Sequence, residues 1–93
     1  MNETNLSKDF VVSNPLGIHA RPASVFVQTA TGFASDVSVT NLDTSNTADG
    51  KSVMSMLMLS APQGTRIRLA VSGEDAVTAM EALSRLIEEG FNE

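Results

Sequence analysis

A histidine and an arginine near the N-terminus are the residues of this chain best suited to chemistry. His19 is the only histidine among 93 residues, and Arg21 follows two positions later within the segment NPLGIHARPAS. Imidazole is the one side chain whose unperturbed pKa lies near neutrality, so one of its nitrogens can act as a nucleophile in a cell. A guanidinium group presents a planar set of donors that suits phosphate oxygens. The spacing therefore predicts a site that handles a phosphoryl group.

The same residues lie where a turn-prone stretch is expected to become a helix, from Ala20 onward. Pro22 fits the first turn, because a missing N–H costs nothing there. The N–H groups of Ala20 and Arg21 would then point at an anion, which the helix dipole also favours. Gly17 allows another part of the backbone to approach closely. We therefore expect His19 to carry the phosphoryl group, Ala20 and Arg21 to bind it, and Gly17 and Pro22 to support the turn.

The elements that would hold this site follow the order β-α-β-β-α-β-α. Alternating or helical spacing predicts strands near residues 10–12, 36–40, 47–48 and 66–71, and helices over residues 20–31, 53–59 and 76–89. Residues 1–7 are polar and expected to be flexible, and residues 72–75 resemble a capping box for the last helix. The inward side chains expected in that helix, which Gly90 closes, are Val77, Met80, Leu83, Leu86 and Ile87. Because the strands alternate so clearly, we expect an antiparallel sheet with three helices on one face, a two-layer α+β domain.

Length and composition indicate one domain over residues 1–93 and exclude several classes of protein. The chain has no cysteine, which excludes disulfides and thiol catalysis, and its single histidine makes a zinc site a poor match. A net charge of −5, without tryptophan or tyrosine, argues against nucleic-acid binding. The apolar runs are too short to cross a bilayer and the N-terminus shows no secretion segment. We expect a soluble cytoplasmic monomer that needs no metal or cofactor.

The segments NPLGIHARPAS and GKSVMSML, in this order of elements, resemble the HPr family. These proteins are the histidine-containing phosphocarriers of the bacterial phosphotransferase system (PTS). The resemblance covers about Lys8 to Phe91 and implies an open-faced β-sandwich with a four-stranded antiparallel sheet. It also implies that His19 takes a phosphoryl group on Nδ1 from phosphorylated Enzyme I and passes it to EIIA domains of sugar permeases or to regulatory proteins. Such a protein is a carrier, not an enzyme with its own turnover.

The second helix holds two further candidates. Ser52 can act simply as its N-cap, whereas the resemblance implies a regulatory phosphorylation site for HPr kinase/phosphorylase. Phosphate there would suit the helix N-terminus, but its charge would repel acidic partners. Val53, Met54 and Leu57 could all be core, but so short a helix must expose some of them. The resemblance assigns these three residues to the docking of Enzyme I and EIIA.

Other functions stay open. The ending GFNE and the run Leu57-Met58-Leu59 are similar to nitrogen-type HPr paralogues, which act in a regulatory phosphorelay, whereas Gly50-Lys51-Ser52 is similar to the sugar-transport type. A binding-only regulator of the same fold is a further alternative. A small α+β ligand-binding module is the last, and it leaves the grouping of His19 and Arg21 unexplained. The first helix has no lysine, so we expect weak electrostatic steering of partners.

Overall fold

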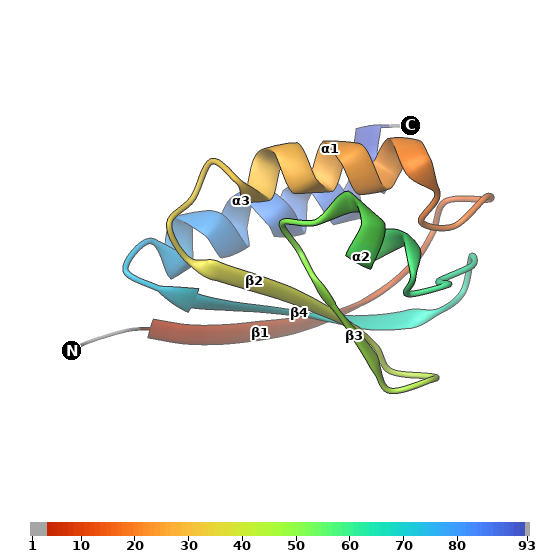
Figure 1. The fold of residues 1–93 in the computed structure, drawn as a ribbon, viewed down its shortest axis with the longest axis horizontal. Coiled ribbons are helices and arrows are strands. Elements are labelled where there is room, and N and C mark those ends of the chain that lie inside the picture. Colours follow the sequence, from red (N-terminus) through yellow and green to blue (C-terminus); the bar gives the residue numbers. More distant parts are fainter. Residues whose placement is uncertain (1–3, 93) are drawn as a thin grey trace.

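The computed structural model describes residues 4–92, which form one antiparallel sheet with helices packed on one face (Figure 1). The elements in chain order are β1 (Thr4–Val11), α1 (Ala20–Ala30), β2 (Asp36–Asn41), β3 (Asn46–Asp49), α2 (Val53–Leu57), β4 (Arg66–Gly73), α3 (Ala76–Glu88) and the 3-10 turn η1 (Gly90–Asn92). The predicted order of elements and the α+β class are confirmed. Within residues 4–92, every helix is too short or too polar to cross a lipid bilayer.

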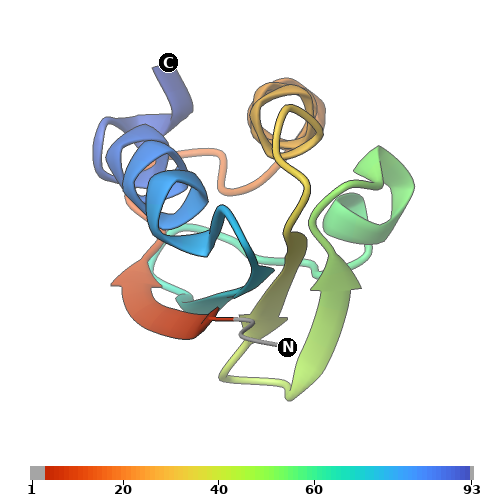
Figure 2. The same ribbon diagram turned by 90° about the vertical axis from the view of Figure 1, so that its left-hand side faces the viewer.

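The sheet has the strand order β1-β4-β2-β3, and every neighbouring pair is antiparallel. Figure 2 shows α1, α2 and α3 above the same face of this sheet, while the opposite face is uncovered. Alternation along β4 explains the two layers: Ile67, Leu69 and Val71 are buried, whereas Arg66 and Arg68 are exposed. The four strands thus present one apolar face, and the three helices cover it.

Helix α1 buries the stripe that its sequence predicts. Ala23, Phe26 and Ala30 are fully buried, and Val27 packs against the core from a half-buried position. The helix ends at Ala30, one residue earlier than expected. This packing fixes the direction of α1 over the sheet, and with it the direction of the helix N-terminus that carries the predicted site (Figure 1).

Helix α3 is rotated relative to the prediction. Leu83, Leu86 and Ile87 are buried and Met80 is half-buried, as expected, but Val77 is 56% exposed. Ala76 and Ala79 are buried in its place. Ala76, Ala79 and Leu83 follow the spacing i, i+3, i+7, and Val77 lies about 100° around the helix from Ala76. The small alanines let the helix approach its neighbours, so the bulkier valine faces outward.

The predicted capping box at residues 72–75 is not formed. Ser72 and Gly73 still belong to β4, and Asp75 occupies the N-cap position without a side-chain capping bond. The Asp75 carboxylate instead accepts hydrogen bonds from the N–H groups of Ala34 (2.8 Å) and Ser35 (2.9 Å) and from the Ser35 hydroxyl. These bonds, chiefly that from the Ser35 hydroxyl, lower the pKa of Asp75 below its ordinary value. The carboxylate thereby fastens the loop after α1 to the start of α3.

The chain ends depart from the sequence prediction in two places. Residues 4–7, expected to be flexible, form the first half of β1 and pair with the end of β4, from Thr4 opposite Gly73 onward; residues 1–3 lie outside the described residues. At the other end, Gly90 and Phe91 have positive φ angles of 69° and 59°. This bend returns Phe91 to the core, where its ring lies 6.4 Å from that of Phe26.

Candidate functional site

His19 is the N-cap residue of α1. Its backbone is extended (φ −103°, ψ −166°), and its carbonyl accepts the N–H of Ala23 at 3.0 Å, which begins the helix. The His19 ring forms no capping hydrogen bond with the described first turn of α1, and the residue is half-buried. Ala20 and Arg21 are the first two helical residues, so their N–H groups have no carbonyl one turn earlier to donate to. The structure thus places a histidine beside two backbone donors at the positive end of a helix dipole.

The turn before His19 is clamped against the loop that follows α2. The N–H of Gly17 donates to the carbonyl of Asn14 (2.9 Å), and the N–H of Ile18 donates to the carbonyl of Ala61 (2.9 Å). Gly17 has a φ of +70°, and a Cβ placed there would lie 2.4 Å from the oxygen of Ala61. Gly17 therefore meets two requirements of this turn, a left-handed backbone and a close approach of two chain segments. The sequence predicted the close approach but not its partner.

Asn14 is a positioning residue that the sequence analysis did not single out. Its side-chain N–H donates to the carbonyl of Gly90 at 2.7 Å, and the residue is buried. This bond joins the start of the His19 turn to the first residue of η1, which follows α3 and lies 76 positions away along the chain. An asparagine before a proline is a common turn-forming residue, so the local sequence does not indicate this long-range contact.

An open hollow lies beside the histidine. It is lined by Pro15, Leu16, His19, Ala20, Arg21, Ser24 and Val25. Arg21 is exposed, and Leu16 is the most exposed large apolar residue of the described chain, at 77%. Pro22, the third residue of α1, is fully buried; its supporting role in the first helical turn stays a prediction. The hollow therefore brings His19 and Arg21 to one accessible surface; Ser24 also lines it, although the sequence analysis did not select that residue.

Helix α2 holds the remaining predicted residues outside this hollow. Ser52 is its N-cap, and its hydroxyl oxygen accepts the N–H of Ser55 at 3.2 Å. Lys51 donates from Nζ to the carbonyl of Phe33 at 2.8 Å, which ties the start of α2 to the loop after α1. The structural role of Ser52 is thus present in the fold, with the residue half-buried.

The predicted docking residues of α2 divide between the core and the surface. Val53 is half-buried and packs against the core, whereas Met54 is 70% exposed and Leu57 is also exposed. Met58, directly after the helix, is exposed as well. The surface of α2 is therefore apolar, and Met54 and Leu57 contribute to it more than Val53 does.

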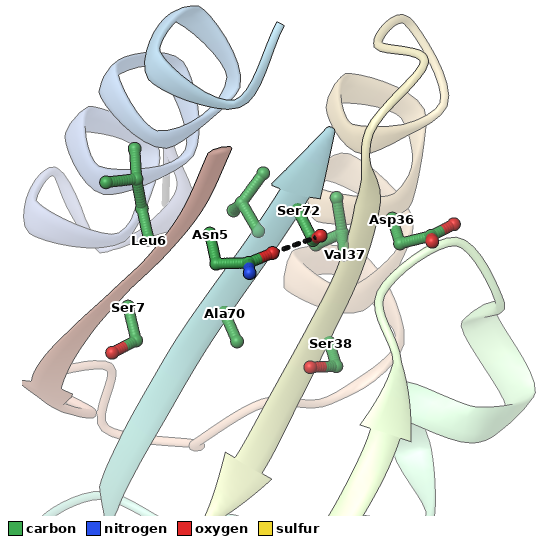
Figure 3. A pocket seen from close by; sticks show the side chains of 9 residues that line it. Asn5, Leu6, Ser7, Asp36, Val37, Ser38, Ala70 and Ser72 are labelled. Carbon is green, nitrogen blue, oxygen red and sulfur yellow. Dashed lines mark hydrogen bonds between the residues drawn. The ribbon is translucent and has the colours of Figure 1, made fainter. Parts of the chain in front are cut away.

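A second hollow lies on the uncovered face of the sheet (Figure 3), and none of the predicted site residues lines it. The open-face side chains that line it come from β1, β4 and β2: Asn5, Ser7, Asp36, Ser38, Ala70 and Ser72. The Ser72 hydroxyl donates to the side-chain oxygen of Asn5 across the β1–β4 pair, as the dashed line in Figure 3 marks. The serine and alanine side chains on these strands are small, which leaves the face shallowly hollowed.

Comparison with known proteins identifies the family. The sequence model described as the PTS HPr component phosphorylation site matches residues 6–89. The chain belongs to the HPr family. It is 45% identical over 89 residues to the phosphocarrier protein HPr of Xylella fastidiosa strain 9a5c, which covers 95% of this chain and 97% of that protein. The crystal structure of HPr-C-His from Thermoanaerobacter tengcongensis superposes with a TM-score of 0.83 at 36% identity, over 100% of this chain and 98% of that one.

Some relatives of this HPr-family chain are much longer. The multiphosphoryl transfer protein of Salmonella typhimurium is 43% identical over 89 residues, yet the chain spans only 24% of its length. The same fold therefore occurs both as nearly a whole protein and as one part of a larger one. The resemblance inferred from the sequence segments is confirmed at the level of family and fold.

Proposed function

We propose that this protein is a phosphocarrier of the PTS. In this proposal His19 accepts a phosphoryl group from phosphorylated Enzyme I on Nδ1 and passes it to an EIIA domain. One observation carries the proposal: the only histidine of the chain is the N-cap of α1, next to the N–H groups of Ala20 and Arg21. Membership of the HPr family supports the same role.

The transfer requires positioning and charge stabilisation more than covalent chemistry. The Nδ1 lone pair of neutral His19 forms a bond to phosphorus, and the bond from phosphorus to the donor nitrogen of Enzyme I breaks, returning its electron pair to the donor. The proton of the neutral His19 ring stays on Nε2. The N–H groups of Ala20 and Arg21 and the Arg21 guanidinium stabilise the negative oxygens during the transfer.

The same site must also release the group. Two amide donors, a helix-end charge of about half a unit and one exposed arginine hold the phosphoryl group in water-accessible surroundings. This set is weaker than an enclosed pocket of several cations, so the reactive P–N bond stays available to the next acceptor. We therefore propose a carrier without turnover of its own, which works in the cytoplasm.

We propose that the partners dock beside the hollow, on the apolar surface of α2. Met54 and Leu57 are exposed there, and Leu16 is exposed at the rim of the hollow. Methionine is flexible and polarisable, which suits a surface that meets partners as unlike as Enzyme I and EIIA. Met54→Asp should weaken binding of Enzyme I, whereas Thr78→Asp on the exposed side of α3 should not. Equal binding by both variants would contradict this assignment.

Ser52 is proposed as a regulatory phosphorylation site for HPr kinase/phosphorylase. A phosphate on this N-cap would meet the positive end of the α2 dipole, so the fold would tolerate it. The same charge would lie at the start of the helix that carries the docking residues, where it would repel an acidic partner. Incubation with the kinase and ATP, followed by peptide mapping, should locate phosphate on Ser52; a protein that stays unmodified would contradict the assignment.

The carrier role is tested by incubation with Enzyme I and phosphoenolpyruvate, followed by intact mass measurement at alkaline pH. The wild type should gain one phosphoryl group that is lost in acid, and His19→Ala should gain none. Gln28→Ala is the matched control, because Gln28 is exposed farther along α1 and does not line the hollow. Phosphate retained by His19→Ala, or none on the wild type, would contradict the proposal.

A further inference from the structure

Three methionines lie within five positions of the chain, in and just after α2, and they differ greatly in solvent exposure. Met54 and Met58 are 70% and 71% exposed, whereas Met56 is 1% exposed. Met54 and Met58 are four positions apart and so share one side of the helical turn, with Met56 on the opposite side. Leu57 lies beside them on the surface. The outer side of α2 is therefore an apolar surface that contains two accessible thioethers.

The chemistry of the rest of the chain concentrates oxidation on these two sulfur atoms. The sequence contains no cysteine, tryptophan or tyrosine, so methionine is its most readily oxidised side chain. Met80 is half-buried, and the hydroxyl of Ser84 donates to its sulfur at 3.3 Å. Met56 lies inside the core. Among the methionines that the structure describes, Met54 and Met58 are thus the ones that solvent reaches freely.

We propose that Met54 and Met58 form a reversible oxidation site that weakens partner docking. This inference rests on the proposed function, because it assumes that α2 contacts Enzyme I and EIIA. The oxidant is hydrogen peroxide: the thioether sulfur attacks one peroxide oxygen, the O–O bond breaks, and the products are the sulfoxide and water. Sulfur loses two electrons and peroxide gains them. A methionine sulfoxide reductase reverses the change with two electrons from a dithiol, releasing the oxygen as water.

The sulfoxide changes docking without changing the phosphoryl acceptor. Its oxygen is a strong hydrogen-bond acceptor, and a partner surface that covers an apolar side chain has no donor for it. We expect the KM for phosphorylated Enzyme I to rise about tenfold when Met54 and Met58 are both oxidised, which corresponds to about 1.4 kcal/mol. No methionine lines the hollow beside His19, so the maximal rate of phosphoryl transfer should stay the same.

The first experiment measures where peroxide reacts. The folded protein is treated with hydrogen peroxide, and the oxidation of each methionine is followed by peptide mapping. Met54 and Met58 should be oxidised well before Met56 and Met80, and unfolding in urea should remove this difference. Oxidation of Met56 as fast as Met54 in the folded protein would overturn the assignment of a selective site.

The second experiment measures docking. The proteins are the wild type, Met54→Leu, Met58→Leu and the double variant. For each protein, the KM for phosphorylated Enzyme I is measured before and after peroxide treatment, and the two values are compared. Treatment should raise the wild-type KM about tenfold and leave the KM of the double variant unchanged. Methionine sulfoxide reductase should return the wild-type KM to its untreated value. An unchanged wild-type KM after complete oxidation would overturn this inference alone. Failure of the untreated wild type to accept phosphate would instead contradict the proposed function.

Discussion

Replacement of Gly17 by alanine tests how the turn before His19 is held. Gly17 has a φ of +70°, and an added Cβ would lie 2.4 Å from the oxygen of Ala61 and 2.7 Å from Cα of Pro62. A left-handed conformation costs an alanine about 1–2 kcal/mol. The overlap with backbone atoms, which must shift to relieve it, adds about 1–3 kcal/mol. We therefore expect Gly17→Ala to lower the free energy of unfolding by about 2–5 kcal/mol.

Gly64 supplies the matched control. Its φ is +91°, but a Cβ placed there meets no atom within 4 Å, so Gly64→Ala carries the backbone strain without the overlap. Urea denaturation of both variants should show that Gly17→Ala is less stable than Gly64→Ala by about 1–3 kcal/mol, because the effect on the unfolded chain is common to both. Phosphorylation by Enzyme I should slow only in Gly17→Ala, whose backbone shift lies two residues from His19. Equal loss of stability in the two variants would refute the proposed contact with Ala61.

Three further predictions concern single side chains. Arg21→Lys keeps the positive charge but loses the planar set of donors, so phosphoryl transfer from Enzyme I should slow without stopping; a wild-type rate would remove Arg21 from the mechanism. Ser52→Ala removes the capping bond to Ser55 and should lower the free energy of unfolding by about 1 kcal/mol, which urea denaturation would reveal or exclude. Asp75→Asn tests a pH dependence. Hydrogen bonds from the Ser35 hydroxyl and the Ala34 N–H lower the pKa of Asp75 below 3.8 in the folded protein. The stability that these bonds contribute is therefore present above pH 3.8 and is lost as the pH falls through the lowered pKa. The stability difference between wild type and Asp75→Asn should therefore be full at pH 7 and shrink in acid; a difference independent of pH would contradict this role.

Regular patterns in the sequence predicted most of the fold. In β2, β4 and α1, the spacing of apolar residues within each element shows which of its sides is buried. Local spacing is therefore sufficient to recognise these elements. Strand β1 was recognised only near Phe10, because an edge strand with mostly exposed residues needs few apolar side chains. Its first half is held by pairing with β4, which the local sequence does not reveal.

The contacts that sequence reasoning missed join distant segments. Asn14 bonds to Gly90, and Asp75 bonds to the loop around Ser35, over separations of 76 and 40 positions. The positive φ angles of Gly90 and Phe91 bend the chain so that the Phe91 ring returns to the core. By contrast, the residues of the candidate site are close together in the sequence, in the loop before His19 and the first helical turn of α1. His19 and Arg21 could therefore be selected from sequence, whereas the contacts that hold the turn required the fold.

The most direct test of the phosphoryl-acceptor site is NMR spectroscopy of ¹⁵N-labelled protein before and after phosphorylation by Enzyme I and phosphoenolpyruvate. The ring nitrogens of His19 should show a phosphorus bond at Nδ1, and the amide protons of Ala20 and Arg21 should shift downfield as they bind the phosphoryl oxygens. A phosphoryl group on another residue, or unchanged amide signals of Ala20 and Arg21 when His19 is phosphorylated, would contradict the account.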